Sequence, residues 1–170
     1  TYEENVKKVS EVVEMAHEKG ATVKGELGHV GDNGDGTDPS LYYTQPEKAK
    51  DFVQKTGVDA LAIAVGNAHG AYKFPPKLDF ERIKTIAEMI DVPLVLHGGS
   101  GLTDHDFQTA IQAGISKVNI FTDVNVAAAQ AAYRGYQEGS GVTEIIPGIV
   151  EAVKQEAVKK MKLFGSCGRA

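Results

Sequence analysis

Short apolar segments alternate with longer amphipathic segments along almost the whole chain, and this order limits the possible folds more than any other feature. The apolar segments have the length and composition of buried strands, and they are Ala21–Leu27, Asp59–Gly66, Val92–His97 and Lys117–Phe121. The segments with helical spacing are Glu3–Lys19, Pro46–Thr56, Asp79–Ile90, Thr103–Ala113, Val124–Glu138 and Glu144–Met161. Strands that are separated by helices of about ten or more residues pair in parallel. The sequence therefore predicts an α/β fold built on a parallel sheet.

The length of the chain, 170 residues, suits one domain, and we expect residues 1–170 to form a single unit. Four strands cannot close a barrel by themselves, and a complete (β/α)₈ barrel needs about 250 residues. The chain is therefore expected to form either an open sheet or about half of a barrel. In the second case Thr1 lies in the middle of a helix, further chain precedes it, and a partner covers the two edges of the sheet.

Charge and apolar content exclude several classes of function. The net charge is −5, and no cluster of Lys and Arg is present that would attract nucleic acid or an anionic membrane. Apolar runs such as Ala60–Gly66 are far shorter than the roughly 20 residues needed to cross a bilayer. The chain shows no export leader, and its only cysteine is Cys167. We therefore expect a cytoplasmic protein with a small-molecule substrate.

Polar residues occur where the expected strands end. Glu26 ends the first strand, and His69 follows the second. His97 ends the third strand, and Asn119 lies near the end of the fourth. Because ligand sites in parallel sheets lie at the carboxyl ends of the strands, these residues are expected to share one site. Two neutral imidazoles suit Zn²⁺, with Glu26 or a residue outside this chain as a third ligand, although two hydrogen-bonded histidines at the rim are the alternative.

A glycine-rich segment, Gly98–Gly101, precedes an expected helix whose start is marked by Thr103 and Asp106 in a capping-box pattern. Backbone N–H groups at a helix start, together with the hydroxyl group of Ser100, can hold a phosphate. Lys73 can supply the countercharge. The alternatives are an ordinary Gly-Ser turn and a surface lysine.

Four motifs in this order make the sequence recognisable, and they are Gly25-Glu26-Leu27-Gly28, Gly66-Asn67-Ala68-His69-Gly70-Ala71-Tyr72-Lys73, Leu96-His97-Gly98-Gly99-Ser100-Gly101 and Lys117-Val118-Asn119-Ile120-Phe121-Thr122-Asp123. Together they resemble the C-terminal half of the class II ketose-bisphosphate aldolases, the fructose- and tagatose-bisphosphate group. The resemblance runs from about Glu3 to the end of the chain. It implies that the four strands are strands 5–8 of a TIM (β/α)₈ barrel, followed by C-terminal helices.

The resemblance also implies roles for individual residues. His69 and His97 match two of the family's three zinc histidines, and Glu26 matches a carboxylate near the metal. Asn119 matches a contact to the hydroxyl and carbonyl end of the substrate. The residues that match phosphate contacts are Gly70, Lys73, Gly98, Ser100 and Thr122. The implied cofactors are a divalent metal, usually Zn²⁺, and a monovalent cation, Na⁺ or K⁺, near the phosphate.

The activity implied by the resemblance is that of a glycolytic-type lyase, which reversibly cleaves a ketose 1,6-bisphosphate into dihydroxyacetone phosphate and glyceraldehyde 3-phosphate. The family's catalytic Asp, beside its remaining zinc histidine, belongs to an earlier strand, so we expect no catalytic residue in this chain. Phe121 stands where the family more often has Asp or Ala, which leaves the choice between fructose and tagatose open. We also expect a homo-oligomer, either a dimer or a tetramer.

Two other functions remain open from the sequence. Lys24 shares a strand face with Glu26 and can act as the buried amine of a Schiff-base aldolase, although such an enzyme has no use for two paired histidines. Alternatively, the isolated chain is a phosphate- or metal-binding half-barrel without catalysis, because one metal ligand and the catalytic carboxylate are missing.

Overall fold

In the computed structural model, which describes residues 1–28, 42–67 and 76–169, four strands alternate with helices. The strands are β1 (Lys24–Leu27), β2 (Ala60–Ile63), β3 (Leu94–Leu96) and β4 (Ile115–Val118). The helices are α1 (Tyr2–His17), α2 (Pro46–Thr56), α3 (Phe80–Met89), α4 (Asp104–Ala113), α5 (Thr122–Gln137) and α6 (Val142–Leu163). The strands pair in parallel and lie side by side in chain order. The predicted α/β fold with a parallel sheet is confirmed.

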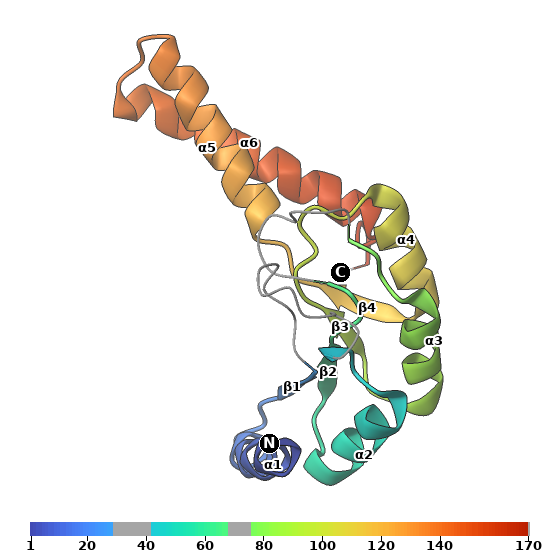
Figure 1. Ribbon diagram of the computed structural model, residues 1–170. Helices are drawn as coiled ribbons and strands as arrows, with labels where there is room; N and C mark the ends of the chain where they lie inside the picture. The colour runs from blue at the N-terminus through green and yellow to red at the C-terminus, as the bar shows by residue number, and fades with distance from the viewer. Residues whose placement is uncertain (29–41, 68–75, 170) are drawn as a thin grey trace.

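Helices α2, α3 and α4 line one face of the sheet (Figure 1). Each helix turns its apolar side chains toward the strands, and Phe52 of α2, Ile83 of α3 and Phe107 of α4 are completely buried. These side chains form one cluster with strand residues such as Leu61 and Leu96. The hydrophobic core therefore lies between the sheet and these helices, where burial of apolar surface stabilises both layers.

The opposite face of the sheet carries the residues that alternate with the core positions. Gly25 lies against Phe52 and Val58 on the helix side, so its neighbours Lys24 and Glu26 point to the other side. The register of the strands continues this second face through Ala60, Ala62, Val95 and Lys117. Charged side chains therefore lie on the outer strands β1 and β4 of the second face, and small ones on β2.

Helix α1 packs beside α2 at the β1 edge of the sheet (Figure 1). The hydroxyl group of Tyr2 donates a hydrogen bond to Oδ2 of Asp51, at 2.6 Å. Burial and this hydrogen bond raise the pKa of Tyr2 to about 12. The side chain of Asn5 donates to the carbonyl oxygen of Glu26, at 3.1 Å, so α1 also supports the backbone of β1.

Helix α1 begins directly after Thr1, the first residue of the chain. Thr1 is the N-cap residue of α1, and its hydroxyl oxygen accepts the N–H of Glu4 at 3.2 Å. The carboxylate of Glu4 in turn accepts a hydrogen bond from the amino group of Thr1, at 2.8 Å. This reciprocal arrangement satisfies donors that the first turn of a helix otherwise leaves unpaired.

The other element boundaries agree with the sequence patterns to within a few residues. The capping box of Thr103 and Asp106 at the start of α4 is confirmed. The strands are shorter than expected, and β4 covers Ile115–Val118 instead of Lys117–Phe121. The reason is that Gly114 ends α4 with a positive φ of 125°, and Ile115 enters the core directly afterwards.

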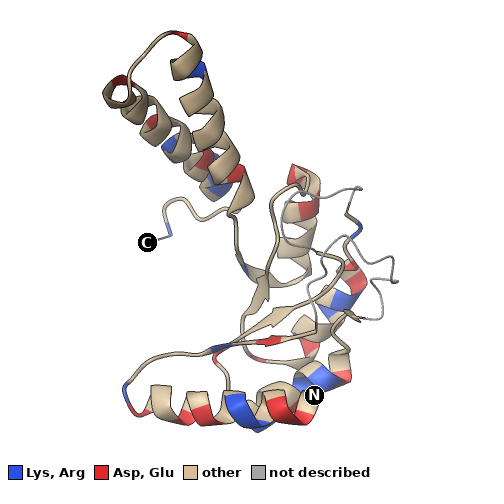
Figure 2. Cartoon of the chain, turned by 60° about the vertical axis from the view of Figure 1, so that its left-hand side comes forward, with Lys and Arg blue, Asp and Glu red and all other residues tan. Residues whose placement is uncertain are grey.

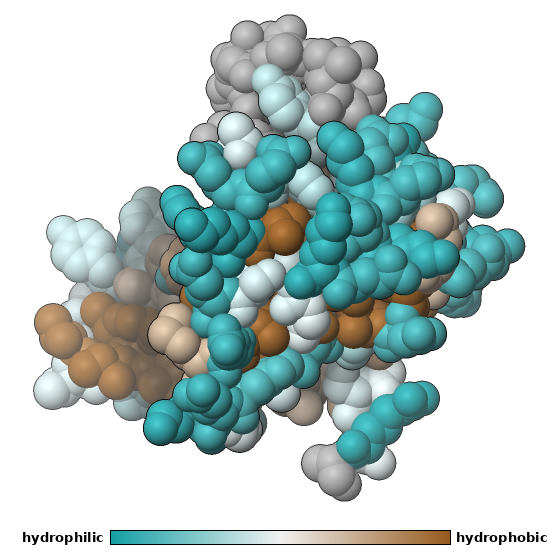
Figure 3. Space-filling view, turned by 90° about the horizontal axis from the view of Figure 1, so that it is seen from below, coloured by the Kyte–Doolittle hydropathy of each residue, from teal (hydrophilic) through white to brown (hydrophobic). Residues whose placement is uncertain are grey.

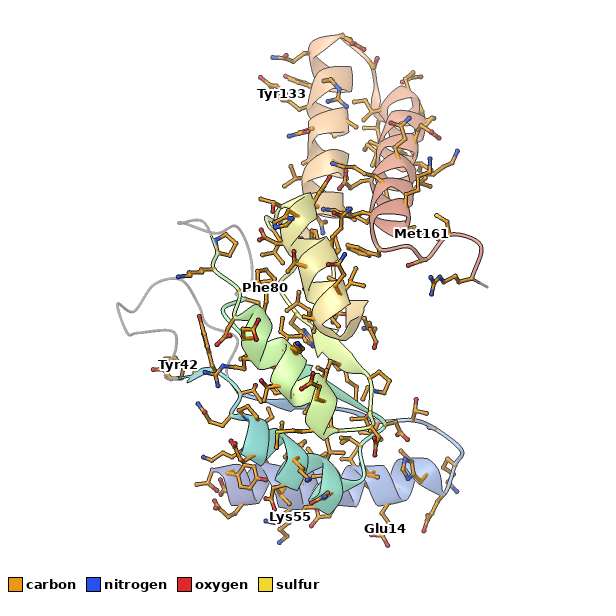
Figure 4. The ribbon with its side chains drawn as sticks, turned by 90° about the vertical axis from the view of Figure 1, so that its right-hand side faces the viewer. Glu14, Tyr42, Lys55, Phe80, Tyr133 and Met161 are labelled. Carbon is orange, nitrogen blue, oxygen red and sulfur yellow. The ribbon has the colours of Figure 1, made fainter. Side chains whose placement is uncertain are left out.

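Helices α5 and α6 form a hairpin that projects away from the sheet (Figures 1 and 2). The two helices pack on each other closely, because a Cβ at Gly135 of α5 would lie only 2.8 Å from Cγ1 of Ile145 on α6. None of the residues of α5, all of which the structure describes, is buried, and Tyr133 points outward from the hairpin (Figure 4). The C-terminal part of α6 returns to the body of the protein, where Lys160 is buried.

Hydrophilic side chains dominate the surface at the end of the molecule formed by α1 and α2 (Figure 3). Glu14 of α1 and Lys55 of α2 point to solvent here (Figure 4). Apolar side chains such as Met15, which is 60% exposed, lie between the charged ones. Within residues 1–28, 42–67 and 76–169, no helix combines the length and the apolar content that crossing a bilayer requires.

The close contact at Gly25 gives a test of the packing between β1 and α2. We expect Gly25→Ala to destabilise the protein by about 1–3 kcal/mol, as overpacked cores generally do. The reason is that the added methyl carbon would lie 2.9 Å from both Cε1 of Phe52 and Cγ1 of Val58. Urea unfolding followed by circular dichroism measures the change.

The matched control makes the same substitution in open space. A Cβ at Gly148 of α6 meets nothing within 4 Å, and Gly148→Ala is expected to stabilise the helix by about 0.5–1 kcal/mol. A Gly25→Ala protein that is as stable as the wild type would contradict the packing described.

Candidate active site

Three of the residues expected at the site lie at the carboxyl ends of β1, β3 and β4. Glu26 is the third residue of β1, His97 directly follows β3, and Asn119 directly follows β4. The N–H of Asn119 donates to the carbonyl oxygen of Leu96 at 2.9 Å, which continues the pairing of the two strands and brings Asn119 beside His97. The side chain of His97 is 15% exposed and that of Glu26 is 43% exposed. The structure therefore brings these residues together at one end of the sheet.

The backbone of His97 is held by Asn67, a buried residue that follows β2. Nδ2 of Asn67 donates to the carbonyl oxygen of His97 at 3.0 Å. Oδ1 of the same side chain accepts the N–H of Val65 at 2.8 Å. One buried amide thus joins the end of β2 to the end of β3, and its hydrogen bonds fix the position of His97.

Both nitrogen atoms of the His97 ring have polar neighbours. Nδ1 lies 3.4 Å from Nδ2 of Asn119. Nε2 lies 2.7 Å from Nζ of Lys24 and 3.8 Å from Oε2 of Glu26. The imidazole ring is therefore the centre of a polar cluster to which β1 and the ends of β3 and β4 contribute.

Lys24 reaches His97 across β2, because β2 carries only small side chains on this face. Ala60 is level with Lys24 in the register, and Ala62 is level with Glu26. Lys24 is exposed, so the expectation of a buried amine for Schiff-base chemistry is wrong. Its ammonium group is instead a hydrogen-bond partner of the imidazole.

Lys117 fixes the orientation of Asn119. Nζ of Lys117 donates to Oδ1 of Asn119, which leaves the Nδ2 group of the amide directed toward His97. Lys117 is not among the residues that the sequence patterns predict at the site. The alternation of side chains along a strand would have predicted its position, because residues two positions apart lie on the same face. Lys117 lies two positions before Asn119, just as Lys24 lies two positions before Glu26.

Glu26 and His97 fit a divalent metal in part. Ligands of a tetrahedral zinc ion at about 2.0–2.2 Å lie roughly 3.3–3.6 Å from one another, which is close to the observed 3.8 Å between Oε2 and Nε2. Across the described residues, no group of three His, Cys, Asp or Glu side chains is arranged to hold a metal ion. The third expected ligand, His69, lies outside the described residues. Because Lys24 contacts the same nitrogen of His97, a metal ion there would have to displace its ammonium group.

The glycine-rich segment after β3 lies beside the start of α5. Gly98 has a φ of 62°, a conformation that glycine adopts without strain. Oγ of Ser100, a residue that is 5% exposed, accepts the N–H of Asp123 at 3.2 Å. This bond joins the segment to the first turn of α5, which Thr122 begins. The other two residues expected to contact phosphate lie outside the described residues, and they are Gly70 and Lys73.

The chain leaves the sheet after β2 and returns before α3 at almost the same point. Gly66 has a φ of 100°, and a Cβ there would overlap the carbonyl oxygen of Lys77 and lie 2.8 Å from the hydroxyl oxygen of Tyr43. The N–H of Asp79 donates to the carbonyl oxygen of Val65 at 2.9 Å. Only glycine combines this backbone conformation with such a close approach.

An adjacent Asp–His pair, the pattern that the resemblance assigns to an earlier strand, occurs in this chain as Asp104 and His105. Both residues are exposed and lie in the first turn of α4. The pair therefore belongs to the helical layer, and it contributes no carboxylate to the cluster around His97.

Comparison with known proteins identifies the family. The profile of the class-II fructose-bisphosphate aldolases matches residues 1–169. The chain belongs to this family. The YdjI protein of Escherichia coli K12 is 42% identical to this class-II aldolase chain over 171 aligned residues, which cover 99% of the chain and 61% of YdjI. The expected family membership is therefore confirmed.

Solved structures of aldolases share the fold. The crystal structure of the YdjI aldolase from E. coli K12 has a TM-score of 0.88 and 40% identity, and the match covers 100% of this chain and 59% of that one. A putative fructose-1,6-bisphosphate aldolase from Coccidioides immitis has a TM-score of 0.87 and 30% identity, with coverages of 99% and 61%. Fructose-bisphosphate aldolase from Campylobacter jejuni, at 22% identity, a TM-score of 0.80 and coverages of 97% and 57%, supports the fold alone.

The chain spans about three-fifths of the length of these relatives. Four parallel strands that alternate with helices, with α5 and α6 after the last strand, agree with the expected C-terminal part of a class II aldolase TIM barrel.

The double hydrogen bond of Asn67 generates a prediction about the position of His97. We expect Asn67→Ala to destabilise the protein by about 1–3 kcal/mol, because it leaves buried backbone groups unpaired. The Cε1–H resonance of His97 in a proton–carbon NMR spectrum should shift at the same time. Asn125→Ala is the control, because Asn125 is an exposed residue of α5 whose side chain donates to the carbonyl oxygen of Phe121, one turn earlier, and to no other described residue. An unchanged His97 resonance in Asn67→Ala would contradict this role.

Proposed function

We propose that this chain supplies the C-terminal half of the active site of a zinc-dependent class II aldolase. The reaction is the reversible cleavage of a ketose 1,6-bisphosphate into dihydroxyacetone phosphate and glyceraldehyde 3-phosphate. The proposal rests on the position of Glu26 and His97 at the strand ends of a chain from this family, where Oε2 of Glu26 lies 3.8 Å from Nε2 of His97. The family is generally dependent on a divalent metal, and an imidazole beside a carboxylate is a donor pair that Zn²⁺ accepts.

The proposed metal ligands are His69, His97 and Glu26. The chemistry that such an ion supplies is Lewis-acid stabilisation of the negative charge left on the substrate when its carbon–carbon bond breaks. The chain's own contribution is to hold His97 in place, through the hydrogen bond from Asn67 to its backbone and the contact of Asn119 with its ring. The proposed fixed orientation lowers the entropic cost of bringing the reacting groups together.

Asn119 is proposed to contact the hydroxyl and carbonyl end of the substrate. Its Oδ1 is occupied by Lys117, so the Nδ2 group is the part of the amide that can donate to a substrate oxygen. Lys24 brings a second ammonium group to the same face of the sheet. These positive charges favour an anionic substrate in a chain whose net charge is negative.

The proposed phosphate contacts are Gly70, Lys73, Gly98, Ser100 and Thr122, with a monovalent cation nearby. Because Oγ of Ser100 accepts the N–H of Asp123, its own O–H hydrogen is left to donate to an anion. The start of α5 adds the positive end of a helix dipole to this region. Phosphate binding here would hold one end of the sugar while the bond near the metal breaks.

The complete enzyme is proposed to need a further barrel half upstream of Thr1. The catalytic carboxylate and the remaining metal ligand belong to that half, and residues 1–170 act as one C-terminal unit of the barrel. We infer a cytoplasmic homo-oligomer, a dimer or a tetramer. Phe121, which precedes α5 and is 76% exposed, is the residue that we propose to compare between fructose- and tagatose-specific relatives, because the family more often has Asp or Ala there.

The first test measures cleavage. A polypeptide that carries an N-terminal barrel half before these 170 residues is expected to cleave fructose or tagatose 1,6-bisphosphate, and exhaustive treatment with a chelator to abolish the activity until zinc is restored. A coupled assay for glyceraldehyde 3-phosphate follows the reaction, and the ratio of kcat/KM for the two ketoses identifies the substrate. Full turnover without metal would refute the proposal. The 170-residue chain alone is expected to be inactive. Turnover by this chain would show that it already contains every residue that the reaction needs.

The second test measures metal binding directly, without activity. His97→Ala is expected to weaken Zn²⁺ binding at least about tenfold, because a lost ligand removes well over 1.4 kcal/mol of binding free energy. Competition with a chromogenic chelator gives the dissociation constant. His105→Ala is the matched control, because His105 is an exposed histidine of α4 outside the cluster. Equal zinc affinity in the two variants would exclude His97 as a ligand.

A further inference from the structure

Lys160 is a lysine that the fold buries although nothing in the proposed chemistry uses it. The residue is 8% exposed and lies in the C-terminal part of α6. Its Nζ lies 2.6 Å from Oδ2 of Asp123 and 3.7 Å from Oε1 of Glu156. The same ammonium group lies 4.9 Å from the centre of the Phe107 ring. Lysine is almost never buried in proteins unless it is paired, so this arrangement requires a reason.

Anchoring of α6 to the body of the protein does not by itself require a charge. An apolar side chain of the same length would pack on Phe107 and avoid the cost of removing an ammonium group from water. The charge has a specific partner instead, because Asp123 approaches Nζ more closely than Glu156 does. The lysine therefore acts on the first turn of α5, where Asp123 lies.

Asp123 is also the residue that contacts the glycine-rich segment. Its N–H donates to Oγ of Ser100, at 3.2 Å, while its side chain, which is 24% exposed, pairs with Lys160. The chain of contacts thus runs from Lys160 through Asp123 to the hydroxyl group of Ser100. A carboxylate directly beside a phosphate subsite would repel the anion unless a positive charge offsets it.

We propose that Lys160 is a positioning residue for the phosphate end of the site. It neutralises the carboxylate of Asp123 and holds the first turn of α5 against Ser100, so that an anion can bind there. The inference rests on the proposed function, because the phosphate subsite at Ser100 is part of that function. Lys160 does not itself contact the phosphate.

The experiment titrates inorganic phosphate into the 170-residue chain and measures its dissociation constant by isothermal titration calorimetry. Lys160→Met is expected to weaken binding about tenfold, which corresponds to about 1.4 kcal/mol, since contacting charged groups are energetically coupled. The double variant Lys160→Met/Asp123→Asn should recover affinity to within about twofold of the wild type, since it lacks the carboxylate that would repel the phosphate. Lys160→Arg should bind as the wild type does. Lys154→Met is the matched control, because Lys154 is a lysine of α6 whose side chain is 66% exposed.

Three results would overturn the inference. Unchanged affinity in Lys160→Met refutes it while leaving the proposed phosphate subsite intact. If the double variant binds phosphate as weakly as Lys160→Met does, the lysine acts by stabilising the fold or by contacting the phosphate itself, and not through Asp123. No phosphate binding by the wild type refutes both the subsite and the inference.

A further variant keeps the test decisive if Lys160→Met fails to fold, which circular dichroism would show. Asp123→Asn alone retains Lys160 and removes the negative charge, so it is expected to bind phosphate at least as tightly as the wild type. Weaker binding by Asp123→Asn would count against the proposed role of the charge pair.

Discussion

The polar cluster around His97 depends on the small side chains that β2 carries on one face of the sheet. Ala60 and Ala62 leave space over β2, between the side chains of β1 and those at the end of β3, and Lys24 crosses this space to the ring of His97. A branched or aromatic residue in place of either alanine would fill the space and keep the side chain of Lys24 on β1 away from the ring of His97. The alanines therefore contribute to the site without containing any reactive group, and their effect comes from the volume that they leave open.

Side-chain hydrogen bonds and ion pairs order the residues on this face of the sheet. Asn67 joins the ends of two strands, and Lys117 orients the amide of Asn119. Lys160, through Asp123, brings the far end of α6 to the start of α5. Each of these residues acts on another residue that is expected to contact substrate or metal. The precision of the site thus depends on residues that lie outside it.

The sequence was informative where short-range patterns determine the structure. Alternating apolar strands and amphipathic helices predict the parallel sheet, and the end of each strand predicts that Glu26, His97 and Asn119 meet. Lys117 was not recognised as part of the cluster, and Lys24 was placed on the face of Glu26 but assigned a different role, because their contacts depend on the register between strands and on the size of the residues on β2. The role of Lys160 depends on how α6 packs against α5 and Phe107, which no local pattern encodes.

The contact between Gly66 and the backbone of Lys77 has a consequence for how such a protein can diversify. Because the chain departs from the sheet and rejoins it at one point, the number of residues between the two positions can change without altering the spacing of β2 and α3. Insertions and deletions in that stretch would therefore be tolerated by the scaffold. The sequence of that stretch is therefore constrained by the proposed roles of His69, Gly70 and Lys73, and not by the sheet and its core.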